Sequence, residues 1–179
     1  IESDAPLPEW RAGAHIAVFL SDGTTRQYSL CGDPADRSYY DIAVLREPDG
    51  RGGSSYLCDE LRVGQRLLVT RPRHHFNLED APFRALVAGG IGITPIMTFA
   101  EELERTGRPY SVTYGGRTAA SMAFRPRLER LRGPVSFVAE DVDGRPDLDA
   151  IVRSVPDGGL VYVCGPLPLL RAVEAAAEA

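Results

Sequence analysis

Short apolar runs separated by turn residues fill the first half of the chain. The runs that predict strands cover residues 15–20, 26–30, 39–46 and 65–70. Asp22-Gly23 can close the first two into a hairpin, and residues 54–61 can form a short helix. Because so little helix separates these strands, the pattern indicates an antiparallel barrel or sandwich, and we expect an antiparallel β-barrel.

After Pro82 the pattern changes to buried strands that alternate with helices. The expected strands cover residues 83–88, 110–114, 135–139 and 160–164. The expected helices lie between Thr94 and Gly107 and over residues 125–131, 147–155 and 166–179. This alternation predicts a doubly wound α/β domain with a parallel sheet. We therefore expect two domains, a β-barrel over residues 1–81 and an α/β domain over residues 82–179.

The first of these helices has the clearest amphipathic pattern. Its apolar face carries Ile96, Met97, Phe99, Ala100 and Leu103. Thr94 suits the N-cap, Pro95 the first turn and Gly107 the end of the helix.

The composition limits the kinds of partner. The 179 residues carry a formal net charge of -5, which opposes binding to nucleic-acid phosphates. No apolar run approaches the roughly 20 residues that cross a bilayer, and no basic segment leads into an apolar stretch at the start. We expect a cytoplasmic monomer with neither nucleic acid nor a membrane as partner.

Metal sites and disulfides are not indicated. Cys31, Cys58 and Cys164 are odd in number and far apart, and they cannot supply the four thiolates of a plant-type iron-sulfur cluster. His74 and His75 would point to opposite faces of a strand. We expect no metal in this chain.

A glycine-rich turn follows the first strand of the second half. Residues 89–95 read Gly-Gly-Ile-Gly-Ile-Thr-Pro and join a strand end to a helix N-terminus, where free N–H groups and the helix dipole favour a phosphate. Pro95 occupies the third glycine position of the usual Gly-x-Gly-x-x-Gly pattern, so backbone geometry explains the turn equally well. Cys164-Gly165-Pro166 lies at another strand end, the edge at which doubly wound sheets bind ligands.

Two segments of the first half can bind an anion beside an aromatic ring. Residues 26–29, Arg-Gln-Tyr-Ser, place Arg26 and Tyr28 on one strand face, with a hydroxyl after them. A flavin ring can stack on Tyr28 and its phosphate can pair with Arg26, although such a pair is more often structural when it stands alone. Residues 51–54, Arg-Gly-Gly-Ser, form a second anion-ready loop whose simpler interpretation is a flexible hairpin.

Taken together and in order, these motifs resemble those of the ferredoxin-NADP reductase superfamily. The Arg-Gly-Gly-Ser loop is similar to that of the phthalate dioxygenase reductase-like branch, whose FMN-containing members supply Rieske oxygenases, O-demethylases and some fused cytochromes P450. The resemblance implies an oxidoreductase that transfers hydride from NADH to FMN. Electrons would then pass to a 2Fe-2S centre that serves an oxygenase.

The resemblance also implies roles for individual residues. FMN would be held by Arg26, Tyr28, Ser29, Ala43, Val44, Arg51, Gly52, Gly53, Ser54 and Thr94. NAD would be held by Gly90, Ile91, Gly92, Thr94, Pro95, Arg117, Thr118, Cys164, Gly165 and Pro166. The residues nearest the hydride transfer, and so the catalytic set, would be Ser29, Thr94 and Cys164.

Two features depart from the branch. His74 stands where the branch commonly has asparagine in a Pro-Arg-Asn-x-Phe stretch, which puts cofactor contacts from that segment in doubt. The branch also carries a 2Fe-2S ferredoxin domain, which this chain cannot supply. We therefore expect a fragment of a larger reductase, shortened at both ends, that acts with a separate 2Fe-2S ferredoxin domain or protein and a downstream oxygenase.

Two other functions remain open. An FAD-dependent ferredoxin or flavodoxin reductase that uses NADPH is one, because Arg117 alone allows either nicotinamide nucleotide. A non-catalytic nucleotide-sensing module is the other. The presence of Arg26, Tyr28 and Ser29 argues against it.

Overall fold

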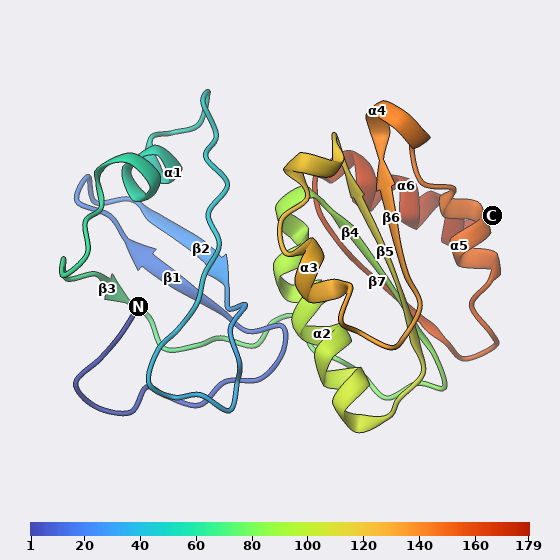
Figure 1. Cartoon of the computed structure of the whole chain (residues 1–179), viewed down its shortest axis with the longest axis horizontal. Helices are drawn as coiled ribbons and strands as arrows, with labels where there is room; N and C mark the ends of the chain where they lie inside the picture. The colour runs from blue at the N-terminus through green and yellow to red at the C-terminus, as the bar shows by residue number, and fades with distance from the viewer. The chain divides into compact units, whose positions relative to one another are not determined.

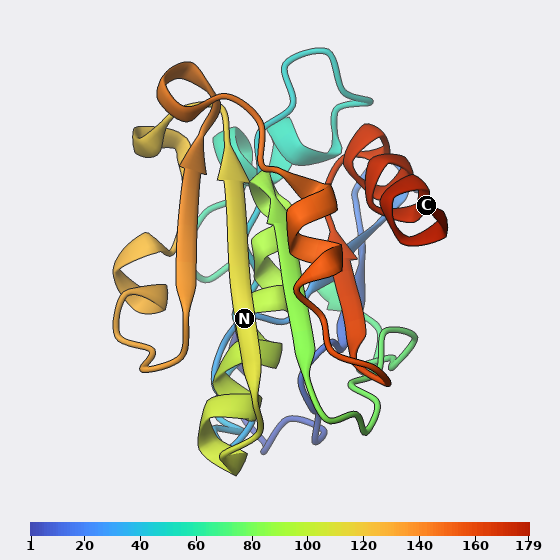
Figure 2. The ribbon, with the colours of Figure 1, turned by 90° about the vertical axis from the view of Figure 1, so that its right-hand side faces the viewer.

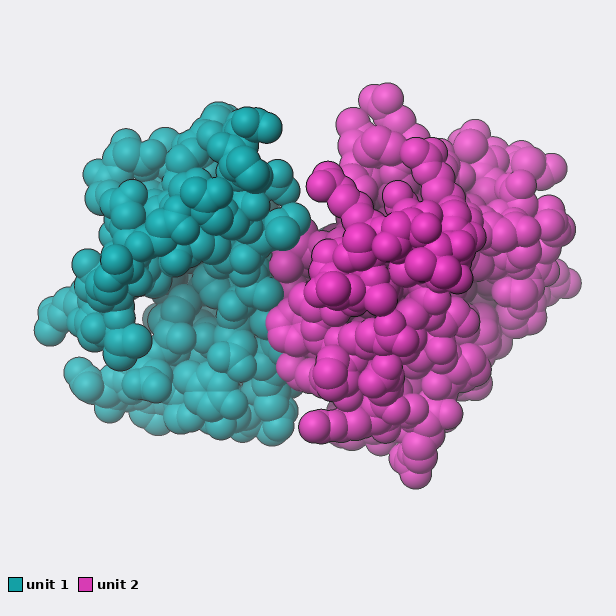
Figure 3. Space-filling view, turned by 45° about the horizontal axis from the view of Figure 1, so that its top comes forward, with its two compact units in different colours: residues 1–77 teal, residues 78–179 magenta.

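The computed structural model describes residues 1–179 (Figure 1). They form two compact units, residues 1–77 and residues 78–179, coloured separately in Figure 3. The division expected from the sequence, after residue 81, lies slightly further along the chain. The helices of the chain are too short or too polar to cross a membrane.

Unit 1 is built on a three-stranded antiparallel sheet with the order β2-β1-β3 (Figure 1). The strands are β1 (His15–Phe19), β2 (Thr25–Ser29) and β3 (Leu68–Val69). Asp22 stabilises the β1–β2 turn, because its carboxylate accepts bonds from the main-chain N–H and the hydroxyl of Thr24 at 2.8 and 2.6 Å. The core of the unit consists of Trp10, Ala14, Ile16, Val18, Leu20, Leu30 and Tyr40.

The expected strand over residues 39–46 is wrong. Only the isolated bridges Glu2–Tyr39 and Leu30–Ile42 pair this segment with other backbone. Beyond Ile42 the segment is held by side chains, since the N–H of Glu47 donates to the hydroxyl of Ser54. Without that strand, the sheet of unit 1 is antiparallel as expected but is not a closed barrel.

The last expected strand of unit 1 is much shorter than residues 65–70. Gln65 is part of a tight turn, because its N–H donates to the carbonyl of Arg62 and its side chain accepts from the N–H of Arg62. Pairing with β1 therefore begins only at Leu68. The helix expected over residues 54–61 is present as the short α1 (Gly53–Ser55), followed by a π-helical turn, η1 (Tyr56–Glu60).

Unit 2 contains a four-stranded parallel sheet with the order β6-β5-β4-β7, which confirms the expected parallel α/β arrangement. The strands are β4 (Arg84–Gly89), β5 (Tyr110–Gly116), β6 (Val135–Ala139) and β7 (Leu160–Cys164). The longer helices are α2 (Ile93–Thr106), α5 (Leu148–Arg153) and α6 (Leu167–Glu178), and the short ones are η2 (Gly90–Gly92), η3 (Ala119–Ser121), α3 (Arg125–Leu128) and α4 (Glu140–Asp143). Helix α2 covers one face of the sheet, and α5 and α6 cover the other (Figures 1 and 2).

Helix α2 buries the apolar face that the sequence predicts. Its five apolar residues, Ile96, Met97, Phe99, Ala100 and Leu103, are completely buried. Gly107 ends the helix in the left-handed conformation, as expected. Thr94 is not the N-cap, because Gly92 takes that position and the Thr94 hydroxyl lies inside the first turn, where it donates to the carbonyl of Ile91 at 3.0 Å.

Candidate functional site

The sheet of unit 2 reverses its strand order between β4 and β7. Strands β5 and β6 extend the sheet to one side of β4, and β7 pairs with β4 on the other, with Ala88 opposite Cys164. Open α/β sheets bind ligands outside the carboxyl ends of their strands at such a switch point. Both sequence motifs of this half, the glycine turn and Cys164-Gly165-Pro166, lie at those two strand ends.

The two motifs are packed against each other with no room for side chains. A Cβ on Gly92 would overlap the carbonyl of Cys164, and a Cβ on Gly89 would lie 3.0 Å from Cδ of Pro166. In return, a Cβ on Gly165 would lie 3.1 Å from the Cα of Gly89. The glycines therefore bring the backbone of the β4–α2 turn onto the end of β7, at the switch point.

The thiol at the end of β7 has no feature of a nucleophile. Burial raises the pKa of Cys164, so the group is a neutral thiol at neutral pH. A neutral, partly buried side chain at this edge can contact an uncharged ring without reacting with it.

The end of β5 carries the remaining expected nucleotide contacts. Arg117 is exposed, and its carbonyl accepts a bond from the N–H of Asp141 at 3.2 Å. Thr118 caps η3, because its hydroxyl accepts from the N–H of Ser121 and its own N–H donates to the Ser121 hydroxyl, both at 3.2 Å. The exposed Arg117 therefore lies directly before a capped turn at the same edge of the sheet.

In unit 1 the first anion motif and the second lie side by side. The guanidinium of Arg26 donates to the carbonyl of Arg51 at 3.3 Å. A Cβ on Gly53 would lie 2.9 Å from Nε of Arg26, so Arg26 packs directly on the start of α1. Gly52 has a φ of 81°, a left-handed conformation that suits glycine. The Arg26 guanidinium, the Arg51 main chain and the start of α1 therefore meet at one corner of the unit.

The ring-binding residues expected in unit 1 lie beside this corner. Tyr28 packs against the core, and burial raises its pKa, so the phenol stays neutral. Val44 lies on a segment in contact with η1, and its carbonyl accepts a long bond from the thiol of Cys58 at 4.0 Å. Ala43 lies next to it on the same segment.

The sequence did not predict the hydrogen bonds that hold residues 43–47 against α1 and η1. Arg46 donates from one nitrogen to both carboxylate oxygens of Asp59 on η1, at 3.1 and 2.9 Å. The Ser54 hydroxyl accepts from the N–H of Glu47 at 3.1 Å, which keeps its own proton available for an anion. Opposite charges at Arg46 and Asp59 are visible in the sequence, but nothing in their spacing shows that they meet.

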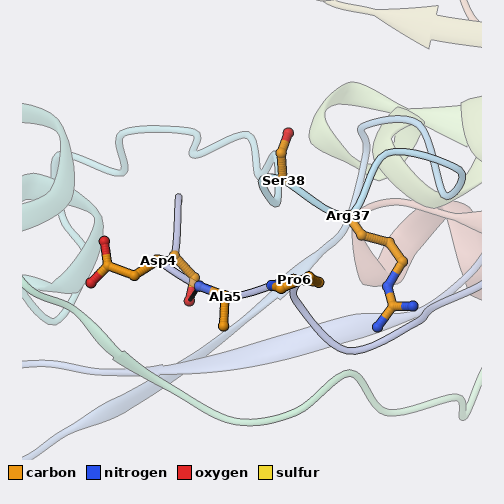
Figure 4. A pocket seen from close by; sticks show the side chains of 6 residues that line it. Asp4, Ala5, Pro6, Arg37 and Ser38 are labelled. Carbon is orange, nitrogen blue, oxygen red and sulfur yellow. Dashed lines mark hydrogen bonds between the residues drawn. The ribbon is translucent and has the colours of Figure 1, made fainter.

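The two anion motifs meet in unit 1, and the glycine turn meets Cys164-Gly165-Pro166 in unit 2. His74, which departs from the resembled pattern, has a buried Nδ1 without a hydrogen-bond partner. A separate hollow in unit 1 is lined by Ser3, Asp4, Ala5, Pro6, Arg37 and Ser38 (Figure 4). Its cation, Arg37, already pairs with Glu9 at 3.0 Å, and we assign no ligand to the hollow.

Comparison with known proteins gives relatives for unit 2 and for the whole chain. A model of the oxidoreductase NAD-binding domain matches residues 86–175. The phenoxybenzoate dioxygenase subunit beta of Ectopseudomonas oleovorans is 44% identical over 173 residues, which are 95% of this chain and 54% of that protein.

Two solved structures are also similar. An intact type IV self-sufficient cytochrome P450 monooxygenase matches 98% of this chain and 23% of its own, with a TM-score of 0.92 and 44% identity. Phthalate dioxygenase reductase, described as a modular structure for electron transfer from pyridine nucleotides to 2Fe-2S, matches 97% of this chain and 56% of its own, with a TM-score of 0.90 and 36% identity. The chain spans about half the length of the sequence relatives it matches.

Proposed function

We propose that this chain, which belongs to the oxidoreductase NAD-binding family and to the phthalate dioxygenase reductase-like branch of the ferredoxin-NADP reductase superfamily, transfers hydride from NADH to a bound FMN. The observation that carries the proposal is the close packing of Gly92 on Cys164 at the switch point of the parallel sheet. This packing supports a nucleotide site because it brings the turn before helix α2 beside Cys164-Gly165-Pro166, and the main-chain N–H groups at a helix start favour a phosphate.

The residues of unit 1 fit the phosphate end of FMN. Arg26 and Arg51 supply two permanent charges, and the amides at the start of α1 supply N–H donors. Each charge-assisted hydrogen bond contributes about 1.5–3 kcal/mol. The absence of a side chain at Gly53 leaves the Arg26 guanidinium in contact with this corner. We assign the phosphate to Arg26, Arg51, Gly52, Gly53 and Ser54.

The flavin ring would lie between the side chains of β2 and the segment of residues 43–47 that contacts η1. Tyr28 offers an uncharged aromatic face, and Ser29 a hydroxyl at the end of β2. Ala43 and Val44 would close the other side of the ring. We propose that this antiparallel unit is the flavin-binding domain of the chain.

The residues of unit 2 would hold the nicotinamide nucleotide. Gly90, Ile91, Gly92, Thr94 and Pro95 form the turn under the pyrophosphate, Arg117 and Thr118 would lie near the ribose, and Cys164, Gly165 and Pro166 near the nicotinamide. The Thr94 hydroxyl donates to Ile91, which leaves its oxygen free to accept from a cofactor. When bound, the flavin supplies the chemistry, because it accepts a hydride and releases electrons singly. We propose that Ser29, Thr94 and Cys164 position the reacting groups.

The onward partners we propose are a 2Fe-2S ferredoxin domain or protein and an oxygenase of the Rieske, O-demethylase or P450 type. The support comes from the relatives, since one is a dioxygenase subunit and another transfers electrons to 2Fe-2S. Net charge and helix lengths give no support for a nucleic-acid or membrane partner.

Flavin identification combined with nucleotide titration tests the proposal. The flavin released from denatured protein should have the mass of FMN, and anaerobic NADH should bleach the bound flavin at lower concentration than NADPH. Colourless protein that cannot be reconstituted with FMN would contradict the proposal. Release of FAD with a preference for NADPH would instead identify a ferredoxin or flavodoxin reductase, and a flavin that neither nucleotide bleaches would indicate a sensing module.

A further inference from the structure

His15 stands directly opposite Ser29 in the β1–β2 pair. The N–H of His15 donates to the carbonyl of Arg73 at 3.0 Å, and its carbonyl accepts from the N–H of Arg73 at 2.8 Å. Because those groups face away from β2, His15 and Ser29 form a non-hydrogen-bonded pair, the kind in which Cα atoms are only about 4.5 Å apart and side chains on one face lie closest. The imidazole and the Ser29 hydroxyl therefore share one face of the sheet as nearest cross-strand neighbours.

The imidazole of His15 has an unmet hydrogen-bonding group. Its Nε2 is buried and has no partner in the structure. A buried polar atom without a partner costs free energy comparable to a lost hydrogen bond, so rotation of a neighbouring hydroxyl that supplies a partner is favoured with or without a ligand. A serine hydroxyl, which rotates to donate or to accept, can meet that need.

The surroundings of His15 keep its ring neutral. Burial lowers the pKa of His15, and the nearby His75, Arg73 and His74 lower it further. The ring of His75 lies 5.2 Å from that of His15, at 59°. His74 has a lowered pKa for the same reason of burial, with Arg11 as the neighbouring charge. All three histidines of the chain thus belong to one cluster, next to two arginines.

We propose that His15 is a positioning residue for the flavin, as the second hydrogen-bond partner of the Ser29 hydroxyl. The proposal rests on the proposed function, in which Ser29 contacts the flavin. A hydroxyl can donate to a cofactor acceptor only if its oxygen remains free to accept, and it can accept from a cofactor donor while its proton goes elsewhere. A neutral imidazole suits both cases, because its two tautomers offer either a donor or an acceptor. A protonated imidazole would offer only donors.

Histidine-ring NMR of the whole chain tests the pair without relying on activity. The chain has only three histidines, so each ring can be followed through a pH titration. In the flavin-free protein, Ser29→Ala should displace the titration curve of His15 and leave that of His74 in place. An unchanged His15 curve would overturn the proposal.

The second measurement is FMN affinity by fluorescence quenching. His15→Leu should weaken FMN binding by about tenfold, the scale of one hydrogen bond, whereas His15→Gln, which retains a donor and an acceptor, should stay within about twofold. The double variant His15→Leu with Ser29→Ala should bind no more weakly than Ser29→Ala alone. Gln27→Ala, an exposed change on the same strand, is the matched control.

Failure of the inference and failure of the proposed function differ in outcome. Wild-type protein that binds no FMN contradicts the proposed function, and the NMR titration still decides whether His15 and Ser29 interact. Wild-type protein that binds FMN, together with additive losses in the double variant, contradicts the role of His15 alone.

Discussion

Gly92 packs against the main-chain carbonyl of Cys164, so the turn after β4 and the end of β7 touch through backbone alone. The contact lies where Ala88 pairs with Cys164, at the carboxyl edge of the sheet. A side chain at position 92 would clash, because the atoms it would meet belong to the backbone at the end of a paired strand and cannot rotate away. The β4–α2 turn and the end of β7 are therefore in direct backbone contact.

Gly92→Ala should damage both the fold of unit 2 and nucleotide binding. Overpacking against backbone typically costs about 1–3 kcal/mol, which urea denaturation can measure. Movement of the turn should also weaken NADH binding by at least about tenfold, since a small misplacement removes main-chain contacts to the pyrophosphate. FMN affinity should change less than NADH affinity, because the residues proposed for the FMN phosphate, Arg26 and residues 51–54, lie in unit 1.

Gly115→Ala is the matched control for this change. A Cβ there would lie 3.7 Å or more from its neighbours, at ordinary contact distance. We expect nearly unchanged stability and NADH affinity. Equal effects of the two substitutions would show that the Gly92–Cys164 contact has no special role.

Gly53→Ala should weaken FMN binding by displacing Arg26. The new Cβ would meet Cδ1 of Leu20 at 2.8 Å and Nε of Arg26 at 2.9 Å, and of these two the partly exposed arginine moves more easily than the buried leucine. Loss of one charge-assisted contact corresponds to about 1.5–3 kcal/mol, or roughly a tenfold to hundredfold rise in the FMN dissociation constant. Ser55→Ala, in the same short helix, should change the constant little. Unaltered FMN binding by Gly53→Ala would remove Arg26 from the phosphate site.

Unit 2 could be predicted well from the sequence because its strands are short apolar runs separated by helices, the first of which, α2, has a clear apolar face. Segment 39–46 could not, because its β-branched and aromatic residues predict a strand while its later part is held by side chains of α1 and η1. Strand propensity cannot reveal that kind of partner.

The sequence predicts which motifs belong to the candidate site but not which of their residues are in contact. Glycine positions at 89–92 and at 165 indicate turns, but their mutual packing depends on β4 and β7 being neighbours, which the order of strands along the chain does not state. His15 illustrates the same limit. A lone histidine in an apolar run gave no functional signal, and only the register of β1 with β2 places it opposite Ser29.

Arg46→Met should release FMN faster while leaving the fold nearly intact. The Arg46–Asp59 pair is half exposed on both sides, and such pairs contribute about 0–1 kcal/mol to stability. Loss of the pair should instead let the segment with Ala43 and Val44 move away from η1. This movement should raise the FMN dissociation rate. Stopped-flow release of FMN and thermal unfolding measure the two effects. The charge swap Arg46→Asp with Asp59→Arg should restore slow release, and failure of the swap together with a large loss of stability would indicate a purely structural role.

Glu104 should make unit 2 more stable at neutral pH than at acidic pH. Its carboxylate accepts bonds from the Tyr110 hydroxyl at 2.6 Å and from Nε of Arg132 at 2.8 Å, and these bonds lower its pKa from 4.5 to about 2. A carboxyl group with a lowered pKa in the folded state stabilises the protein fully above its unfolded pKa. The contribution is lost as pH falls from about 4.5 towards about 2.

Glu104→Gln should therefore be less stable than the wild type at neutral pH, and the two curves of unfolding free energy should converge as pH falls. Urea denaturation from neutral pH to about pH 3 measures both curves. The matched control is Glu102→Gln, which removes a carboxylate that pairs only with Arg105 on the exposed side of α2 and should change stability little. A gap between wild type and Glu104→Gln that stays constant over this range would show that the carboxylate charge of Glu104 does not stabilise the fold.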